Sequence, residues 1–118
     1  MFIQIIEYKE QPILYSDYTN CKAEELIEKL NEAAAYFRSH LSKPVLTLSD
    51  FSGSFGSKEF MSEAARLNKE IFDEKTIKGA VLGITGVKKI LLDGYNTFGK
   101  TKLKPFKSKQ DALDYLTR

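Results

Sequence analysis

Two apolar periodicities alternate along this sequence, and together they limit the fold more than any other feature. Short runs of β-branched and aromatic residues are followed by longer stretches in which apolar residues recur every three or four positions. The runs are typical of strands and the stretches of amphipathic helices. Their order is ββαβαβαβα, and alternation of this kind produces crossover units in a mostly parallel sheet. The sequence therefore predicts an α/β fold, a mostly parallel mixed sheet with an N-terminal antiparallel hairpin and four helices.

The strand runs differ in how apolar they are, and this predicts their places in the sheet. Pro12 interrupts the first run, which predicts a hairpin between two short strands. Residues 80–84 (AVLGI) are apolar throughout, and residues 45–50 (VLTLSD) carry three large apolar residues, which suits buried central strands. Pro105 suits an edge strand, because proline donates no hydrogen bond to a neighbour. The expected strands are residues 2–8, 13–18, 45–50, 80–84 and 102–106.

The helices carry start and stop signals as well as stripes. Thr19 and Asn20 are good N-cap residues for the first helix, and Pro44 marks its end. Ser57 is expected to cap the second helix, and Ser108 the fourth. The third helix follows the Thr85–Gly86 turn. The stripe of the first helix is Leu26, Leu30, Ala33, Ala34, Phe37 and Leu41, and that of the second is Phe60, Ala64, Leu67 and Ile71.

Length and composition predict one domain over residues 1–118. The chain has 118 residues, which is a usual length for one domain, and its 42% hydrophobic and 29% charged residues are a composition typical of globular proteins. One cysteine, Cys21, makes no internal disulfide, which fits a reducing compartment. The first residues do not resemble a signal peptide, and no apolar run approaches the ~20 residues of a membrane span. We therefore expect a cytoplasmic protein without a membrane span.

Charge is distributed unevenly along the chain. Residues 1–74 carry 8 basic and 13 acidic side chains (−5), residues 75–109 carry 9 and 1 (+8), and residues 110–118 carry 1 and 2 (−1), which gives the net +2. A basic face can attract an anionic partner. Phe106 is the only aromatic residue in the lysine tract 100–109, whereas nucleic-acid readers combine basic residues with several stacking rings. The lysines are better explained as protection of a sheet edge, so no nucleic-acid partner is expected.

Two segments are expected at the carboxyl ends of strands, where open α/β sheets bind their ligands. One is 50–57, and the other is 83–89. In the second, a strand enters a helix through glycines, a threonine and two lysines, and a helix N-terminus can hold an anion. The P-loop and dinucleotide patterns are absent, and a plain turn explains the glycines equally well. The candidate anion-binding or ligand-binding residues are Asp50, Thr85, Gly86, Lys88 and Lys89.

The same segments provide little for catalysis. Ser52, Ser54 and Ser57 would need a neighbouring base to act as nucleophiles, and the sole histidine, His40, falls at the far end of a helix. One histidine and one cysteine do not suggest a metal site. We expect no catalytic residue, no metal and no cofactor.

The order of elements and two segments resemble a known superfamily. Residues 45–53 (VLTLSDFSG) and 80–92 (AVLGITGVKKILL) each lead from a strand into a helix, and Pro105–Phe106 precedes an Ala-Leu-x-x-Leu helix at 112–116. In these features the chain resembles the STAS-like superfamily, and in particular its SpoIIAA-like bacterial group. The resemblance implies a single STAS/SpoIIAA-like domain.

The resemblance also implies a regulatory role. In the anti-sigma-factor antagonists of the superfamily, a partner kinase phosphorylates a serine at the start of the helix after the third strand. Ser57 is in that place, but Gly56 stands where the family pattern has aspartate. A related lipid-carrier fold suggests instead an apolar ligand between sheet and helices.

From this we expect a non-enzymatic module that binds a protein partner through residues 50–72. Aromatic residues and methionine are enriched at interfaces. The alternative is a small-ligand, anion or lipid-binding protein with its site near 50–57 and 85–89. A homodimer is a further candidate assembly. The residues expected to contact the partner or to be phosphorylated are Ser54, Phe55, Ser57, Phe60 and Met61.

Overall fold

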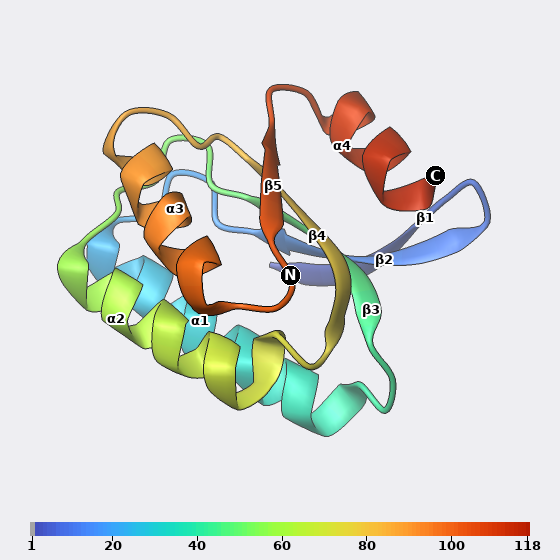
Figure 1. Cartoon of the computed structure of the whole chain (residues 1–118), viewed down its shortest axis with the longest axis horizontal. Helices are drawn as coiled ribbons and strands as arrows, with labels where there is room; N and C mark the ends of the chain where they lie inside the picture. The colour runs from blue at the N-terminus through green and yellow to red at the C-terminus, as the bar shows by residue number, and fades with distance from the viewer. Residues whose placement is uncertain (1) are drawn as a thin grey trace.

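The computed structural model describes residues 2–118 as one five-stranded sheet with helices on both faces (Figure 1). The strands lie in the order β1-β2-β3-β4-β5, with β1 antiparallel to β2 and the other pairs parallel. The predicted fold class is therefore confirmed. The strands are β1 (Ile3–Tyr8), β2 (Gln11–Asp17), β3 (Val45–Asp50), β4 (Thr76–Leu82) and β5 (Leu103–Phe106).

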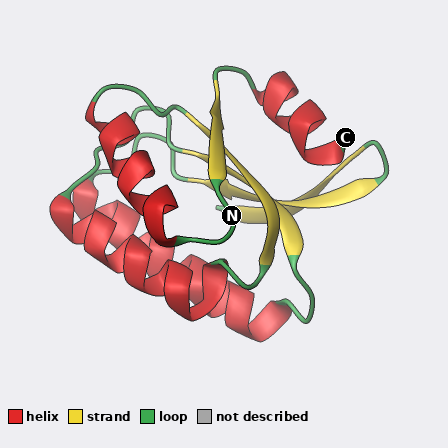
Figure 2. Cartoon of the chain, viewed as in Figure 1, coloured by secondary structure: helices red, strands yellow, loops and turns green. Residues whose placement is uncertain are grey.

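The helices form two unequal layers (Figure 2). Three helices, α1 (Ala23–His40), α2 (Lys58–Leu67) and α3 (Val87–Phe98), cover one face of the sheet. A short π-helical turn, η1 (Asn68–Phe72), continues α2. The other face is covered by α4 (Lys109–Thr117) alone. No helix within residues 2–118 combines the length and the apolar character that crossing a membrane requires.

Each face of the sheet has its own apolar core, as expected when strand side chains alternate between faces. The predicted stripe of α1 packs on one face through buried Leu26, Leu30, Ala33, Ala34 and Phe37. The core on the opposite face joins α4 to the three central strands. Its buried residues are Ile13, Leu46, Leu48, Ala80, Leu82, Ala112, Leu113 and Leu116.

The start of α1 differs from the prediction, which placed the cap at Thr19 or Asn20. The helix begins at Ala23 and Lys22 is its N-cap residue. Thr19 instead donates its amide and hydroxyl hydrogens to Asp17 Oδ1, at 2.9 and 2.6 Å. Asn20 adopts a φ of +58°, and its amide donates to the Ser52 carbonyl at 2.9 Å. Because the Asn20 amide is bonded to the loop at Ser52, the helix begins only at Ala23.

Other boundaries follow local signals closely. The predicted cap residues are confirmed: Ser57 Oγ accepts from the Phe60 amide (3.0 Å), and Ser108 Oγ accepts from the Asp111 amide (3.1 Å). The fourth strand, predicted at 80–84, begins earlier and ends earlier, at Thr76 and Leu82, because it pairs with β3 from Thr76 onward. The residues 76–79 include a threonine and a lysine, so a search for apolar runs did not assign them to the strand.

Candidate functional site

Two loops meet at the carboxyl edge of the sheet (Figure 1). We call residues 51–57 the serine loop and residues 83–86 the glycine turn. The Lys88 ammonium donates to the Phe51 carbonyl at 3.0 Å and ties α3 to the serine loop. Gly83 has a φ of +74°, and a Cβ at this position would lie 2.3 Å from the serine loop backbone. The two segments that the sequence places at the carboxyl strand ends are therefore in direct contact.

Asp50 braces the serine loop rather than entering a cleft. Its Oδ1 accepts from the amide and the hydroxyl of Ser52, at 3.0 and 2.6 Å. Strand alternation places Asp50 on the same face as Leu46 and Leu48, which pack against α4. Asp50 therefore lies on the opposite face of the sheet from the three-helix layer.

The serines of the loop differ in accessibility. Ser54 is buried, and its hydroxyl donates to the Phe51 carbonyl at 2.7 Å. Ser57 is half-buried, and its oxygen caps α2 through the Phe60 amide. Ser57 is thus the more accessible of the two predicted contact or modification sites.

The beginning of α3 uses part of its own hydrogen-bonding capacity. The Lys88 amide donates to the Thr85 carbonyl (3.2 Å) and the Lys89 amide to the Gly86 carbonyl (3.1 Å). Thr85, Gly86 and Lys89 are exposed, whereas Lys88 is half-buried. An anion at this turn would therefore meet fewer free amide groups than at an uncapped helix start.

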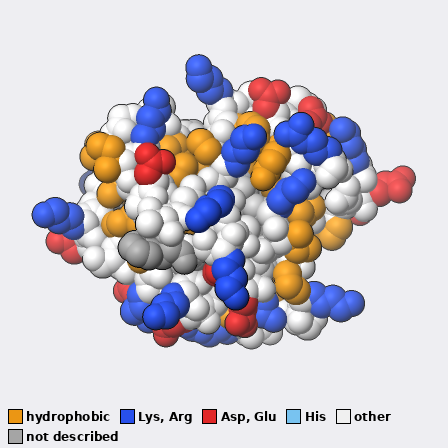
Figure 3. All heavy atoms as spheres, viewed as in Figure 1, with side chains coloured by type: hydrophobic (Ala, Val, Ile, Leu, Met, Phe, Trp, Pro, Cys, Tyr) orange, Lys and Arg blue, Asp and Glu red, His pale blue; other side chains and the backbone are white. Residues whose placement is uncertain are grey.

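Three exposed apolar side chains lie on the two adjoining segments. Phe55 is 66% exposed, Val87 61% and Ile90 70%. The serine loop lies against α3, since a Cβ at Gly56 would be 2.3 Å from Leu91 Cδ1. We call Phe55, Val87 and Ile90 the apolar rim. Figure 3 shows hydrophobic side chains gathered over α3 on the face in view.

The other predicted apolar anchors are directed inward. Phe60 is half-buried and packs edge-on against Phe51, with ring centroids 6.2 Å apart. Met61 is also half-buried and, like Phe60, borders the cavity described next. Of the three predicted apolar contact residues, Phe55 belongs to the apolar rim, whereas Phe60 and Met61 do not.

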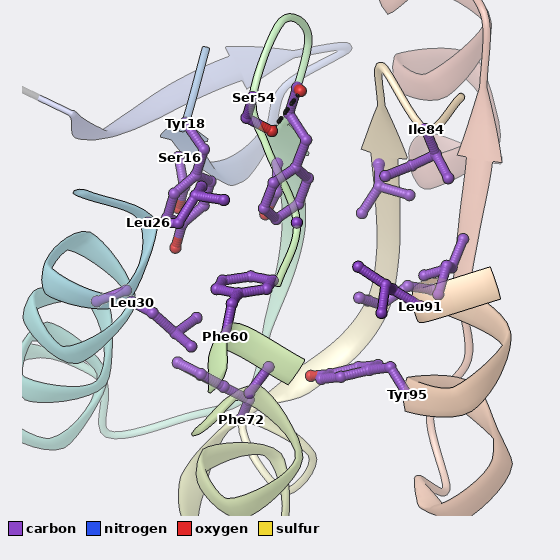
Figure 4. A pocket seen from close by; sticks show the side chains of 18 of the residues that line it. Ser16, Tyr18, Leu26, Leu30, Ser54, Phe60, Phe72, Ile84, Leu91 and Tyr95 are labelled. Atoms are coloured by element: carbon purple, nitrogen blue, oxygen red, sulfur yellow. Dashed lines mark hydrogen bonds between the residues drawn. The ribbon is translucent and has the colours of Figure 1, made fainter. Parts of the chain in front are cut away.

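An apolar cavity of about 120 Å³ lies beneath the two loops, between the sheet and α1, α2 and α3. In Figure 4, Leu26 and Leu30 from α1 face Leu91 and Tyr95 from α3 across this space, with Phe60 between them. The cavity reaches from Ser54 and Lys88 at the loops to Phe37 and Phe72 at the far end of the helices. The sheet and the three helices on this face therefore build one site together.

The sheet side of the cavity carries hydroxyl groups. Ser16, Thr47 and Ser49 point to the three-helix layer, while their neighbours Ile13, Leu46 and Leu48 fill the α4 face. The more thickly covered face thus has the smaller and more polar side chains, and it is left incompletely filled. Sequence reasoning missed these three residues, although serine and threonine alternate there with large apolar residues.

Burial changes the acidity of three groups that line the cavity. The pKa of Tyr18 and that of Tyr95 are raised, chiefly because burial disfavours the charged phenolate. The Tyr95 hydroxyl donates to Asn68 Oδ1 at 2.7 Å. The pKa of the Lys88 ammonium is lowered by burial, with nearby Asp50 acting in the opposite direction. Lys88 is therefore a partly desolvated cation beside an apolar space.

The α4 face carries a basic, aromatic surface that the sequence did not reveal. Lys78, Lys104 and Arg118 each lie within 5.4 Å of the centre of the Tyr115 ring. Lys109 lies over Tyr15 at 4.9 Å. The fold thus places the rings of Tyr15 and Tyr115 beside the lysine tract, but lysine and arginine side chains already pack on both rings. That no nucleic acid binds here stays a prediction.

No group of three histidine, cysteine, aspartate or glutamate side chains in the described part of the chain is arranged to hold a metal ion. The groups at the two loops include hydroxyls, the Asp50 carboxylate, the ammonium groups of Lys88 and Lys89, and apolar surface. Such groups bind and orient molecules.

Comparisons with known proteins identify the fold. No family model matches the chain, and no curated protein matches it. Among solved structures, it is similar to an uncharacterized protein of the DUF3478 family with a SpoIIAA-like fold from Shewanella loihica PV-4. The TM-score is 0.71 at 18% identity, over 97% of this chain and 91% of the other.

A second similar structure is an anti-sigma-factor antagonist (STAS) domain protein from Planctomyces limnophilus. The TM-score is 0.58 at 18% identity, over 98% of this chain and 97% of the other. The resemblance inferred from the sequence is confirmed at the level of the fold: this chain has a SpoIIAA-like, STAS-like α/β fold.

Proposed function

We propose that this chain is a non-enzymatic regulatory module of the cytoplasm that binds a protein partner at the carboxyl edge of its sheet. The interface comprises the serine loop and α2, within residues 50–72, and extends to the first turns of α3. Similarity to a STAS domain protein supports a regulatory role by analogy of fold.

The apolar rim is the observation that carries the proposal. Five large apolar side chains are exposed in the described residues, and three of them (Phe55, Val87 and Ile90) belong to the rim. The other two, Ile5 and Ile77, are on strands outside the two loops. Scattered exposed apolar residues are ordinary, but a group on adjoining segments is typical of an interaction site.

Ser57 is the residue at which we propose that the interface is regulated. It is half-buried at the first position before α2, where a phosphate would be stabilised by the helix dipole. The family pattern places aspartate before the serine, and this chain has Gly56 there. A kinase that acts on Ser57 would therefore recognise a different neighbour. Mass spectrometry of protein purified from its source, with Ser57→Ala as control, tests the modification.

A co-precipitation experiment with matched variants tests the interface. Phe55→Ala with Ile90→Ala removes most of the rim, and Ile5→Ala with Ile77→Ala removes a similar apolar area elsewhere. Proteins recovered by the wild type and by the Ile5/Ile77 variant, but lost from the Phe55/Ile90 variant, are the expected result. Identical recovery by all three proteins would reject the proposed surface. Light scattering on the same variants detects a homodimer formed through the rim.

The cavity favours a second function, the binding of a small molecule. Its lining is mainly apolar with a few convergent polar groups, which is the usual character of a ligand site. It lies directly beneath the serine loop and the glycine turn. The two functions are compatible, because the rim is outside and the cavity inside the same two loops.

A further inference from the structure

The cavity is small, and its size limits what it can hold. A volume of about 120 Å³ is close to that of an engineered protein cavity of roughly 150 Å³ that binds benzene. The cavity extends along α1 from Leu26 to Phe37, which are ~16 Å apart at 1.5 Å per residue. Its occupant must therefore have an apolar body about as large as one aromatic ring or a short acyl chain.

Charge along the cavity is one-sided. Among the described residues that line it, Lys88 is the only one with a charged side chain. The Lys88 ammonium donates one hydrogen bond, to the Phe51 carbonyl, and an ammonium has three N–H groups. Burial lowers the pKa of Lys88 and the charge of Asp50 opposes this, but Asp50 lies on the α4 face, where its carboxylate accepts from Ser52. The cavity thus presents a cation without an acid of its own.

We propose that this cavity binds a small monocarboxylic acid whose carboxylate pairs with Lys88 and whose apolar body lies between Leu30, Phe60 and Leu91. This assignment rests on the ligand-binding function proposed above and gives it a ligand class. The body fits an apolar volume, and the carboxylate meets the one cation at the loop end. Since Lys88 also holds the Phe51 carbonyl, the ligand would bind directly beneath the serine loop.

A monoanion suits this site better than a phosphate. One ammonium can neutralise one carboxylate, and the charge-assisted hydrogen bond between them is stronger than a neutral one. A phosphate carries up to two charges and more acceptor atoms than one ammonium can satisfy, and burying the unpaired charge in a mainly apolar cavity has a considerable cost. A neutral molecule would fit the space but would leave the Lys88 ammonium without a ligand partner.

Titration with phenylacetate and hexanoate, and with the neutral analogue 2-phenylethanol, tests the proposal. Binding to the full chain is measured by calorimetry and by ¹⁵N-edited NMR. We expect saturable binding of both acids, with shifts at residues of the serine loop and of α3. Lys88→Met keeps the apolar stem and removes the charge, so it should weaken phenylacetate binding about tenfold or more. It should change the affinity for 2-phenylethanol less than about twofold.

Two further variants separate the sources of binding. Lys89→Met removes the exposed neighbouring charge and should leave the affinity for phenylacetate unchanged. Ser49→Leu occupies much of the cavity and should abolish binding of both acids and of the alcohol. Circular dichroism confirms that each variant is folded.

The outcomes distinguish the ligand class from the site. If 2-phenylethanol binds as tightly as phenylacetate, and Lys88→Met changes neither, the cavity is a ligand site but the carboxylic-acid assignment is wrong. If no probe binds to the wild type, or if Ser49→Leu binds as well as the wild type, the cavity is not a ligand site. Loss of phenylacetate binding in Lys89→Met but not in Lys88→Met would place the anion at the outer surface of α3 and overturn the proposal.

Discussion

Filling the cavity should stabilise the protein, and Ser49→Leu is the change that tests this. Ser49 is half-buried in the central strand β3, faces the three-helix layer and borders the cavity. If the cavity were completely filled, about 120 Å³ at about 24 cal/mol per Å³ would be worth about 3 kcal/mol. That value is the upper limit for any single filling substitution.

The expected gain for Ser49→Leu is smaller. Leucine adds roughly three methylene-sized groups, each worth about 0.8 kcal/mol when buried, and loses about 0.5–1 kcal/mol of rotamer freedom. The net gain in the free energy of unfolding is about 1.5–2 kcal/mol. At an unfolding entropy of about 2.1 cal/mol/K per residue, a chain of 118 residues should then unfold about 6–8 °C higher.

Urea and thermal unfolding, followed by circular dichroism, measure this gain. Ser49→Ala is the matched control, because it removes the same hydroxyl but leaves the space empty, and it should change stability by less than about 0.5 kcal/mol. A Ser49→Leu protein that is less stable than wild type would refute the reasoning, since overpacking a filled core costs 1–3 kcal/mol. Equal stability of the two variants would mean that the leucine points to solvent.

Three other predictions follow from single contacts. Ser57→Ala removes the cap of α2 and should lower stability by about 1 kcal/mol in urea unfolding, whereas Ser57→Asp, which can still cap, should lower it less. Gly83→Ala should destabilise the protein more than Gly86→Ala. Both glycines have positive φ, so each substitution costs backbone strain of about 1–3 kcal/mol, but only at Gly83 would the new Cβ also collide with backbone. The pKa of Tyr18 is raised in the folded protein, whereas in the unfolded chain this tyrosine ionises at its ordinary pKa of 10.0. Above pH 10 the unfolded state therefore loses the Tyr18 proton first, and the free energy of unfolding should fall as the pH rises. Urea midpoints from pH 9 to 11.5 should fall less steeply for Tyr18→Phe, and an unchanged slope would show that Tyr18 ionises normally in the folded protein.

Several features of the fold were determined by the sequence on its own, because short-range physics controls them. The stripe on α1 follows from the 3.6-residue period, and the caps at Ser57 and Ser108 need only a side chain three residues from an amide. β3 matches its predicted bounds of 45–50, since large apolar and β-branched residues between a proline and a polar loop favour a short strand.

Local signals failed where a distant segment competes for the same groups. Asn20 has the chemistry of an N-cap, yet its amide donates to the distant Ser52 carbonyl, while Thr19 is held by its near neighbour Asp17. Strand β4 begins earlier than its apolar run because β3 pairs with it from Val45, and pairing does not require apolar side chains. Tertiary contacts decided both boundaries.

The candidate site shows the same division more sharply. From the sequence it was possible to predict that Ser57 and Lys88 lie near the same edge of the sheet, because the carboxyl ends of parallel strands coincide. The sequence did not reveal which face of β3 the three helices cover. Ser49 and Thr47 therefore looked like ordinary strand residues until α1, α2 and α3 packed over them.

Local sequence pattern and the order of elements were thus sufficient to predict the STAS-like fold. The cavity, its single cation and its hydroxyl-bearing wall were set only when segments up to about 90 residues apart came together, from Leu14 on β2 to Leu103 on β5. Periodicity tells which side of a strand a residue is on. Only packing tells whether the space on that side is filled.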